Sequence, residues 1–233
     1  EIGSGLVGSE MCIRDSPTPV TNMTAFTLEA LVNPAAKKNN SILSTIMGIE
    51  GKFLVRLGDD YLSWNQIQVV WDSGSYDYYG GSVEGKLSNI NMTINANEWS
   101  HIAVTFGEKT IKVYVNGVEK GSSTTNVPSS VNFGIAHNDE QGTRITRCFW
   151  VGYSYEHARY FPGMMSELRI WNRVLTADEL ANATRRYGVD PKSEGLVTYW
   201  KCDEGQGDVI KDHTSYRNDL ASDGLKWEPV SLP

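Results

Sequence analysis

Two short stretches of the sequence combine aromatic rings with hydrogen-bonding groups, and they are its clearest candidates for chemistry. Residues 72–82 read DSGSYDYYGGS, and residues 153–161 read YSYEHARYF. Aromatic rings stack against the apolar C–H faces of sugars, while polar side chains hold the sugar hydroxyls. We therefore predict a ligand site in these stretches; the alternative is that the rings only cover the backbone of their loops. With Trp64, which precedes the first stretch, the predicted ligand-binding residues of loops 64–82 and 153–161 are Trp64, Tyr76, Tyr78, Tyr79, Tyr155, Glu156, His157 and Tyr160.

Catalysis is not predicted, because the acidic residues are badly spaced for it. Neighbouring carboxylates occur at 59–60, 139–140, 178–179 and 203–204. Adjacent side chains of a strand point to opposite faces, so such a pair cannot flank one glycosidic bond. The four His are scattered, and no Ser, His and Asp residues form a recognisable nucleophile motif. We predict that the chain is not an enzyme; a divergent glycoside hydrolase is the alternative.

The overall composition argues against two classes of function. The 233 residues carry a net charge of −7 and no basic stripe that could neutralise phosphates, so nucleic acid is not an expected partner. No run of about 18 apolar residues is present, so we do not expect the chain to span a membrane.

The cysteines give no disulfide framework. There are three, Cys12, Cys148 and Cys202, which is an odd number. Cys148 and Cys202 lie in apolar, strand-like runs. They are predicted to be two buried thiols; the alternative is one Cys148–Cys202 bridge in an oxidising compartment.

Alternating apolar and polar residues predict many short β-strands. AFTLEALV (25–32) and SHIAVTF (100–106) alternate with a period of two, and TIKVYVNGVEKGS (110–122) reads as a hairpin. In that hairpin, Asn116-Gly117 suits a type I′ turn. About a dozen such segments with turn residues between them predict an all-β, two-sheet antiparallel jelly-roll sandwich.

One segment breaks the strand period and predicts one short helix near 176–186. Thr176 and Glu179 have the spacing of a capping box at its start. Leu175, Leu180 and Ala183 are expected to face a sheet.

The first sixteen residues, EIGSGLVGSEMCIRDS, stand apart from this pattern. EMCIRDS looks like the translation of a sequencing-library adaptor. We predict a non-native, adaptor-derived tail at 1–16 and one domain at 17–233.

Three stretches together resemble a known family. They are FTLEALVNP (26–34) with NEWSHIAVTFGEKTIKVYVNGVEKG (97–121), FPGMMSELRIWNRVLTADEL (161–180) and GLVTYWKCDEGQGDVIKDHTSYRNDL (195–220). As a set they resemble the laminin-G-like, concanavalin A-like lectin and glucanase jelly-roll domains, over residues 25–233. In many members a stretch like the third begins the domain, whereas here it comes last. We expect it to close the same sandwich, followed by an edge strand at KWEPVSL (226–232).

The resemblance also predicts which side chains fill the core. The family pattern places Trp99, Trp150, Trp171 and Trp200 in the core. The alternation of strand 196–202 places Val197, Tyr199 and Lys201 on one face. Leu196, Thr198, Trp200 and Cys202 would then lie on the other.

The order of the stretches resembles the C-terminal domain of surface lipoproteins of glycan-foraging Gram-negative gut bacteria. In these a small β-sandwich module precedes the laminin-G-like domain. The resemblance implies non-catalytic binding of an oligosaccharide, polysaccharide or glycoprotein glycan at the outer-membrane surface, and an N-terminal module outside this sequence. The alternative is a protein-interaction or spacer module of such a lipoprotein.

Members of the family often hold one structural Ca²⁺ through carboxylates and carbonyls. The residues that could do so are Asp203, Asp212, Asn218 and Asp219. The alternative is that Asp212 and Asn218 hydrogen-bond the backbone of their own turn.

Overall fold

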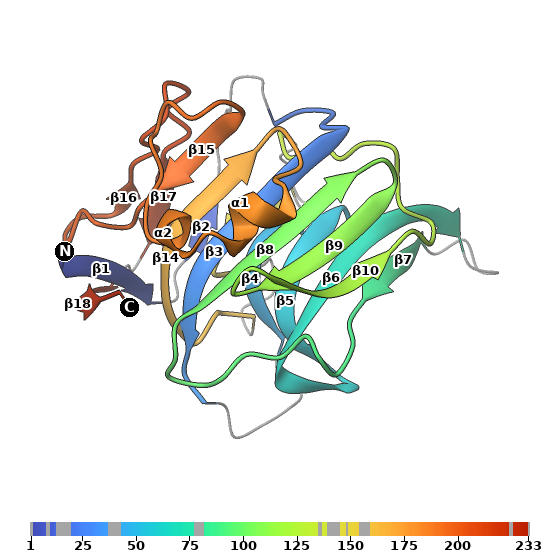
Figure 1. The fold of residues 1–233 in the computed structure, drawn as a ribbon, viewed down its shortest axis with the longest axis horizontal. Helices are drawn as coiled ribbons and strands as arrows, with labels where there is room; N and C mark the ends of the chain where they lie inside the picture. Colours follow the sequence, from blue (N-terminus) through green and yellow to red (C-terminus); the bar gives the residue numbers. More distant parts are fainter. Residues whose placement is uncertain are drawn as a thin grey trace.

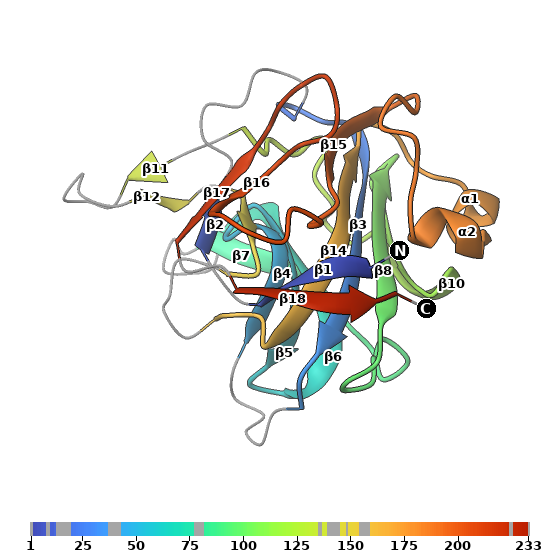
Figure 2. The same ribbon diagram turned by 90° about the vertical axis from the view of Figure 1, so that its left-hand side faces the viewer.

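The protein is a sandwich of two antiparallel sheets, which confirms the predicted fold class (Figures 1 and 2). The computed structural model describes residues 2–7, 10–12, 20–36, 43–76, 82–134, 137–138, 145–147, 149–153, 159–223 and 226–232. Figure 2 shows two helices outside the first sheet and a small hairpin projecting beyond the second. No helix in these ranges is long and apolar enough to cross a membrane.

The first sheet contains eight strands. In spatial order they are β10 (Val118–Ser123), β9 (Thr110–Val115), β8 (Ser100–Gly107), β3 (Ala25–Pro34), β14 (Gly163–Trp171), β1 (Ile2–Val7) and β18 (Lys226–Ser231), with β15 (Leu196–Trp200) also pairing β14. The pairing of β15 with β14 confirms that the third stretch closes the same sandwich. β18 ends the spatial order, as expected of an edge strand.

The second sheet also contains eight strands. In spatial order they are β16 (Val209–Ile210), β17 (Leu220–Asp223), β2 (Glu10–Cys12), β13 (Trp150–Val151), β4 (Ser44–Ile49), β5 (Phe53–Asp59), β6 (Leu62–Tyr76) and β7 (Ser82–Leu87). The projecting hairpin consists of β11 (His137–Asn138) and β12 (Ile145–Arg147).

An aromatic cluster lies between the sheets and fixes their packing. Phe26 stacks on Phe106 within the first sheet, with ring centroids 4.7 Å apart. Phe53 of the second sheet meets Phe26 edge-on at 5.0 Å, and Phe133 does the same. All four rings are buried. Such geometry adds about 0.5–1.5 kcal/mol per pair beyond area burial.

The predicted hairpin at 110–122 is confirmed. Asn116 has φ 51° and Gly117 has φ 80°, as a type I′ turn requires. Ile111, Val113 and Val115 of β9 face the core.

The predicted alternation along β15 is wrong in part. Val197, Trp200 and Cys202 lie in the main core, whereas Leu196 and Tyr199 lie in a second cluster under the helices. The register with β14 shifts between Ile170 and Trp171, so that one β15 residue is left unmatched. Such a bulge changes which face the following side chains take.

The tryptophan prediction holds for three of four residues. Trp150, Trp171 and Trp200 are buried, whereas Trp99 is only half-buried, one residue before β8 begins. Cys202 is buried, and Cys148 lies outside the described residues.

The predicted single helix is two short helices, α1 (Ala177–Ala181) and α2 (Ala183–Arg186). The capping box at Thr176 and Glu179 is confirmed. Asn182 separates the helices, because its backbone is extended (ψ 104°) and its side chain accepts a hydrogen bond from the Thr184 amide. Leu175 and Leu180 are buried as expected; Ala183, beyond the break, is exposed.

The segment predicted to be an adaptor-derived tail contributes β1 and β2. β1 lies between β14 and β18, and β2 lies between β13 and β17. Backbone pairing does not depend on the origin of a sequence, so the adaptor origin stays a prediction.

Candidate functional site

The turn between β4 and β5, residues 50–52, contacts both predicted aromatic stretches. Glu50 Oε2 lies 2.9 Å from Arg159 Nη1, in the 153–161 stretch. Lys52 Nζ lies 2.9 Å from Asp72 Oδ2, where the 72–82 stretch begins. The Asp72 amide also donates to the Lys52 carbonyl at 3.0 Å. Two stretches about eighty residues apart in sequence therefore meet at one turn. We call residues 50–52, together with Asp72, Arg159 and Tyr160, the turn site.

An aromatic cluster runs outward beside this turn. Trp150 of β13 meets Tyr153 edge-on, with ring centroids 5.1 Å apart, and Tyr153 meets Tyr160 at 4.8 Å. Trp150 and Tyr153 are buried, while Tyr160 is 37% exposed. Tyr160 is thus the surface end of a ring cluster anchored in the fold.

Charged groups on the outer face of the second sheet are paired with one another. Buried Arg56 donates to Gln68 Oε1 at 2.9 and 2.6 Å and to Asp59 at 3.0 Å. Its Nη1 is 3.8 Å from Glu50, which also holds Arg159. Because each guanidinium has a carboxylate beside it, the face carries little net charge under Tyr160.

An open cleft with mostly polar lining residues lies beside Lys52 and Asp72. Its volume is about 390 Å³. It is lined by Asn22, Lys52, Asp72, Ser73, Gly74 and residues 128–132. The Lys52 hydrogen bond lowers the pKa of the Asp72 carboxyl from its usual value, so Asp72 is a charged acceptor at neutral pH.

Of the other predicted ligand residues, only Trp64 has a side chain within the described part of the chain. Tyr76 ends β6, and its side chain lies outside the described part, as do Tyr78, Tyr79, Tyr155, Glu156 and His157. Trp64 is half-buried at the opposite end of β6, eight residues before Asp72, which is roughly 25 Å along an extended strand. The structure therefore does not bring Trp64 to the turn site.

Besides the Glu50–Arg159 ion pair, buried polar atoms near the turn site include some with no hydrogen-bond partner within the described part of the chain. Among them are Trp150 Nε1 and Thr45 Oγ1. The Thr45 amide donates to the Arg159 carbonyl at 3.1 Å, which places Thr45 beside the 153–161 stretch. Unsatisfied buried groups are uncommon in native proteins and call for an explanation, a bound ligand among them.

The residues predicted to hold Ca²⁺ fall into two groups. Asp212 is buried, and its two carboxylate oxygens accept four hydrogen bonds, from the amides of Tyr199, Thr214 and Asn218 and from the Thr214 hydroxyl. These donors occupy the lone pairs that a cation would need. Asp219 Oδ1 accepts from the Asp212 amide at 2.8 Å.

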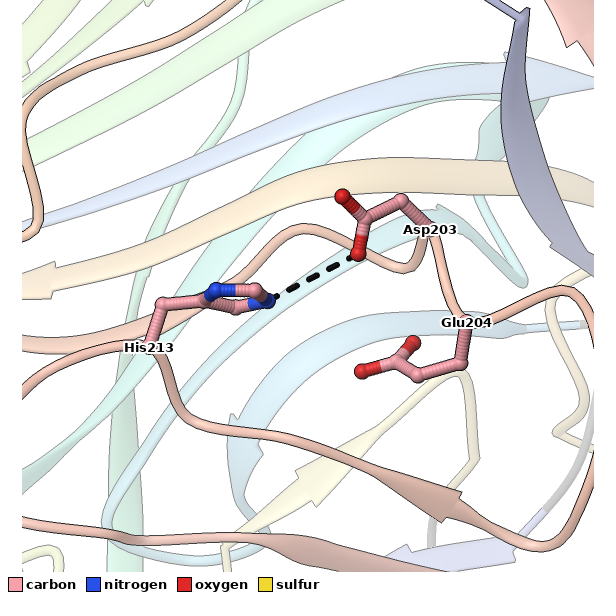
Figure 3. A group of neighbouring side chains, drawn as sticks. All are labelled: Asp203, Glu204 and His213. Atoms are coloured by element: carbon pink, nitrogen blue, oxygen red, sulfur yellow. Dashed lines mark ion pairs between the residues drawn. The ribbon is translucent and has the colours of Figure 1, made fainter.

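Asp203 belongs to the second group. Its carboxylate gathers with that of Glu204 and the imidazole of His213 (Figure 3). Calcium binding stays a prediction. Of the four residues predicted to hold Ca²⁺, Asp203 is the one that lies in this cluster of metal-ligating side chains.

The outer face of the first sheet carries a closed polar network under the helices. Glu29 of β3 accepts from Trp171 Nε1 at 2.5 Å, lies 3.0 Å from His101 Nε2 and is 3.7 Å from Arg169. All are buried. Burial alone would raise the pKa of Glu29, but the His101 hydrogen bond and the Arg169 charge outweigh it and lower this pKa to about 2.

This network also holds the helices. Arg169 donates to the carbonyls of Arg185 and Arg186 in α2 at 2.9 and 3.2 Å, and it pairs with Glu167. Glu167 in turn accepts from the Tyr199 hydroxyl at 2.5 Å. Every charge here faces protein, so we interpret this network as structural.

The sequence matches the family model of the Concanavalin A-like lectin/glucanases superfamily over residues 8–181. The chain belongs to this superfamily. The match ends at the last residue of α1, so the residues around Asp203 and Asp212 lie beyond it. No curated protein matches the sequence.

The similar solved structures include two that cover all or nearly all of this chain. One is a proposed carbohydrate-binding protein from Bacteroides ovatus ATCC 8483, with 26% identity and a TM-score of 0.74. The similarity covers 100% of this chain, which spans 61% of that structure's length. The other is a heptameric SAP-like pentraxin from Limulus polyphemus, with 13% identity, a TM-score of 0.60, and coverage of 97% of this chain and 95% of that one. At that identity the pentraxin shows the fold alone.

Proposed function

We propose that this chain is a non-catalytic carbohydrate-binding domain whose ligand contacts the turn site. One observation carries the proposal: the β4–β5 turn pairs with both aromatic, hydrogen-bonding stretches, through Glu50 and Lys52. Superfamily membership and the similarity to the Bacteroides ovatus protein support the ligand class.

Each part of the turn site has a role in this proposal. The Tyr160 ring stacks on the apolar face of a sugar, at the exposed end of its cluster. Lys52 and Asp72, whose side chains are 39% and 31% exposed, hold hydroxyls in the cleft. The site is shallow and open, so few contacts offset the cost of immobilising a flexible sugar, and affinity should be weak.

The charges of the site favour binding over hydrolysis. A glycosidase needs one carboxylic acid with a raised pKa to protonate the leaving oxygen. Here the pKa of Asp72 is lowered by Lys52, and Glu50 lies between two guanidinium groups. The lowered pKa makes Asp72 unsuited to be that acid, and both Glu50 oxygens lie beside guanidinium groups.

The cell-surface setting is part of the same proposal. In this proposal an N-terminal β-sandwich module precedes the chain in a surface lipoprotein. The upstream coding sequence tests this directly. We expect a signal peptide ending in a lipid-modified Cys, followed by a small β-rich module; an upstream sequence with neither would contradict it.

The binding proposal is tested on a glycan array with the purified chain and two variants. Tyr160→Ala removes the exposed ring of the turn site. Tyr216→Ala is the matched control, since Tyr216 is 39% exposed in the loop between β16 and β17. A stacked ring contributes about 0.5–1.5 kcal/mol, so Tyr160→Ala should weaken binding about two- to tenfold while Tyr216→Ala leaves it unchanged.

A third variant, Tyr76/Tyr78/Tyr79→Ala, tests the 72–82 stretch in the same array. Reduced binding would assign that stretch to the site as well. If the folded chain binds no glycan, the carbohydrate proposal is wrong and a protein-interaction or spacer role is favoured. If it binds but neither Tyr160→Ala nor the triple variant weakens binding, the site is elsewhere.

A further inference from the structure

Three metal-ligating side chains converge at the end of β15, away from the turn site. Asp203 and Glu204 come after this strand, and His213 returns to it through the loop after β16 (Figure 3). One ligand atom of each lies within 4.8 Å of the others.

The spacing of these atoms suits coordination better than hydrogen bonding. His213 Nε2 is 3.6 Å from Asp203 Oδ1, which is too long for a hydrogen bond. Tetrahedral metal sites with bonds of about 2.0–2.2 Å hold their ligand atoms about 3.3–3.6 Å apart. The two side chains are 32% and 43% exposed, so small rotations can close the remaining gap to Glu204.

Glu204 gives the second, independent indication of a ligand. Its Oε1 accepts from the Lys211 amide at 2.8 Å. Its Oε2 is buried and has no hydrogen-bond partner within the described residues. Ligating carboxylates commonly have one oxygen oriented by a hydrogen bond and the other on the metal. A buried carboxylate oxygen without a donor is otherwise costly.

The backbone around the cluster is fixed before any ion arrives. The His213 amide donates to the Tyr199 carbonyl at 2.9 Å, and Asp212 forms a bridge with Trp200. The four hydrogen bonds to the Asp212 carboxylate hold the same loop. Asp212, predicted as a calcium ligand, acts in this arrangement as the support of His213.

We propose that Asp203, Glu204 and His213 bind a divalent transition-metal ion, with Zn²⁺ as the best-fitting example. One imidazole and two carboxylates leave a fourth position for water. The imidazole is the reason for this choice, since Ca²⁺ takes oxygen ligands only. Lys201 Nζ lies 3.8 Å from Asp203 Oδ2 and offsets part of the negative charge.

The test is calorimetric titration of the full chain with ZnCl₂, and separately with CaCl₂. His213→Ala and Glu204→Gln remove ligands. Asp208→Asn is the control, because Asp208 is an exposed acid of the same loop outside the cluster. Lys201→Met removes the competing cation. Circular dichroism of each variant establishes that it is folded.

We expect Zn²⁺ to bind the unaltered chain. His213→Ala and Glu204→Gln should weaken this binding at least about tenfold, because even supporting groups of metal sites are worth about 10–100-fold. Asp208→Asn should leave the affinity unchanged, and Lys201→Met should not lower it. Absence of Zn²⁺ binding, equal binding by the two ligand variants, or binding of Ca²⁺ alone would overturn the proposal.

Discussion

The outer faces of the two sheets both carry largely buried ion pairs, but different groups lie beside these pairs. On the first sheet, Glu29 and Arg169 face the helices, and their network ends on backbone carbonyls of α2. On the second, Glu50 and Arg159 lie beside Tyr160, whose ring reaches solvent. A buried ion-pair network therefore does not identify a functional face; the groups that lie between the network and solvent do.

In the part of the chain that the structure describes, buried polar atoms without a hydrogen-bond partner occur on both outer faces, so they do not distinguish one face from the other. His101 Nδ1 and Arg169 Nε lack partners under the helices, as Thr45 Oγ1 and Trp150 Nε1 do near the turn site, within the described residues. The difference that remains is access, because Tyr160 of the second face exposes its ring to solvent, whereas the network of the first face ends on backbone carbonyls of α2.

The largest effect is expected from Arg169→Ala. The substitution leaves the carboxylates of Glu29 and Glu167 buried without their counter-charge. Breaking a buried pair in this way costs about 3–5 kcal/mol. Urea unfolding of the variant should show a loss of this size. Arg173→Ala, which breaks the part-exposed pair with Glu179, is the control and should cost about 1 kcal/mol or less. Similar losses for both would contradict the structural role of the network.

A second prediction concerns acid stability. The pKa of Glu29 falls from an ordinary value of 4.5 to about 2 on folding, so its ionised form stabilises the folded state above pH 4.5. That stability, about 3 kcal/mol, is lost as the pH falls from 4.5 to 2. In Glu29→Gln the unfolding free energy should depend less steeply on pH in that window. An equally steep dependence in the variant would show that other groups are responsible.

The smallest effect belongs to the helix start. Thr176→Ala removes the side chain that accepts from the Glu179 amide at 3.2 Å, and loss of an N-cap costs about 1 kcal/mol. Thr184→Ala, an exposed position inside α2, should change stability by less than about 0.5 kcal/mol. Denaturant midpoints of the two variants measure the difference. If Thr176→Ala costs no more than Thr184→Ala, the capping box contributes nothing measurable.

Sequence patterns predict the fold well wherever local chemistry decides it. The Asn116-Gly117 turn and the Thr176–Glu179 cap are predictable because their residues are close together in the chain. The β15 bulge and the break at Asn182 are not, because a register shift depends on the partner strand and the break on one residue's backbone angles.

Only part of the candidate site can be predicted from the sequence, for a similar reason. The composition of its stretch predicts Tyr160, whereas Glu50 and Lys52 were missed. Arg159, the partner of Glu50, is far away in sequence, and Asp72, the partner of Lys52, lies on β6. No local sequence pattern therefore links either pair. The one sequence signal was a charged Glu-Gly-Lys turn between two apolar strands. His213 was missed because the expected ligand set contained oxygen donors alone.

The most direct test of the proposed binding face is a map of amide chemical shifts by NMR as an array-selected oligosaccharide is added. We predict that perturbed amides gather at residues 50–52, 72–74 and 159–161. Amides around Glu29 and Arg169, on the other sheet, should not move. Perturbation centred on α1, α2 and the Glu29 network, with the turn site silent, would contradict the assignment of binding to the second sheet.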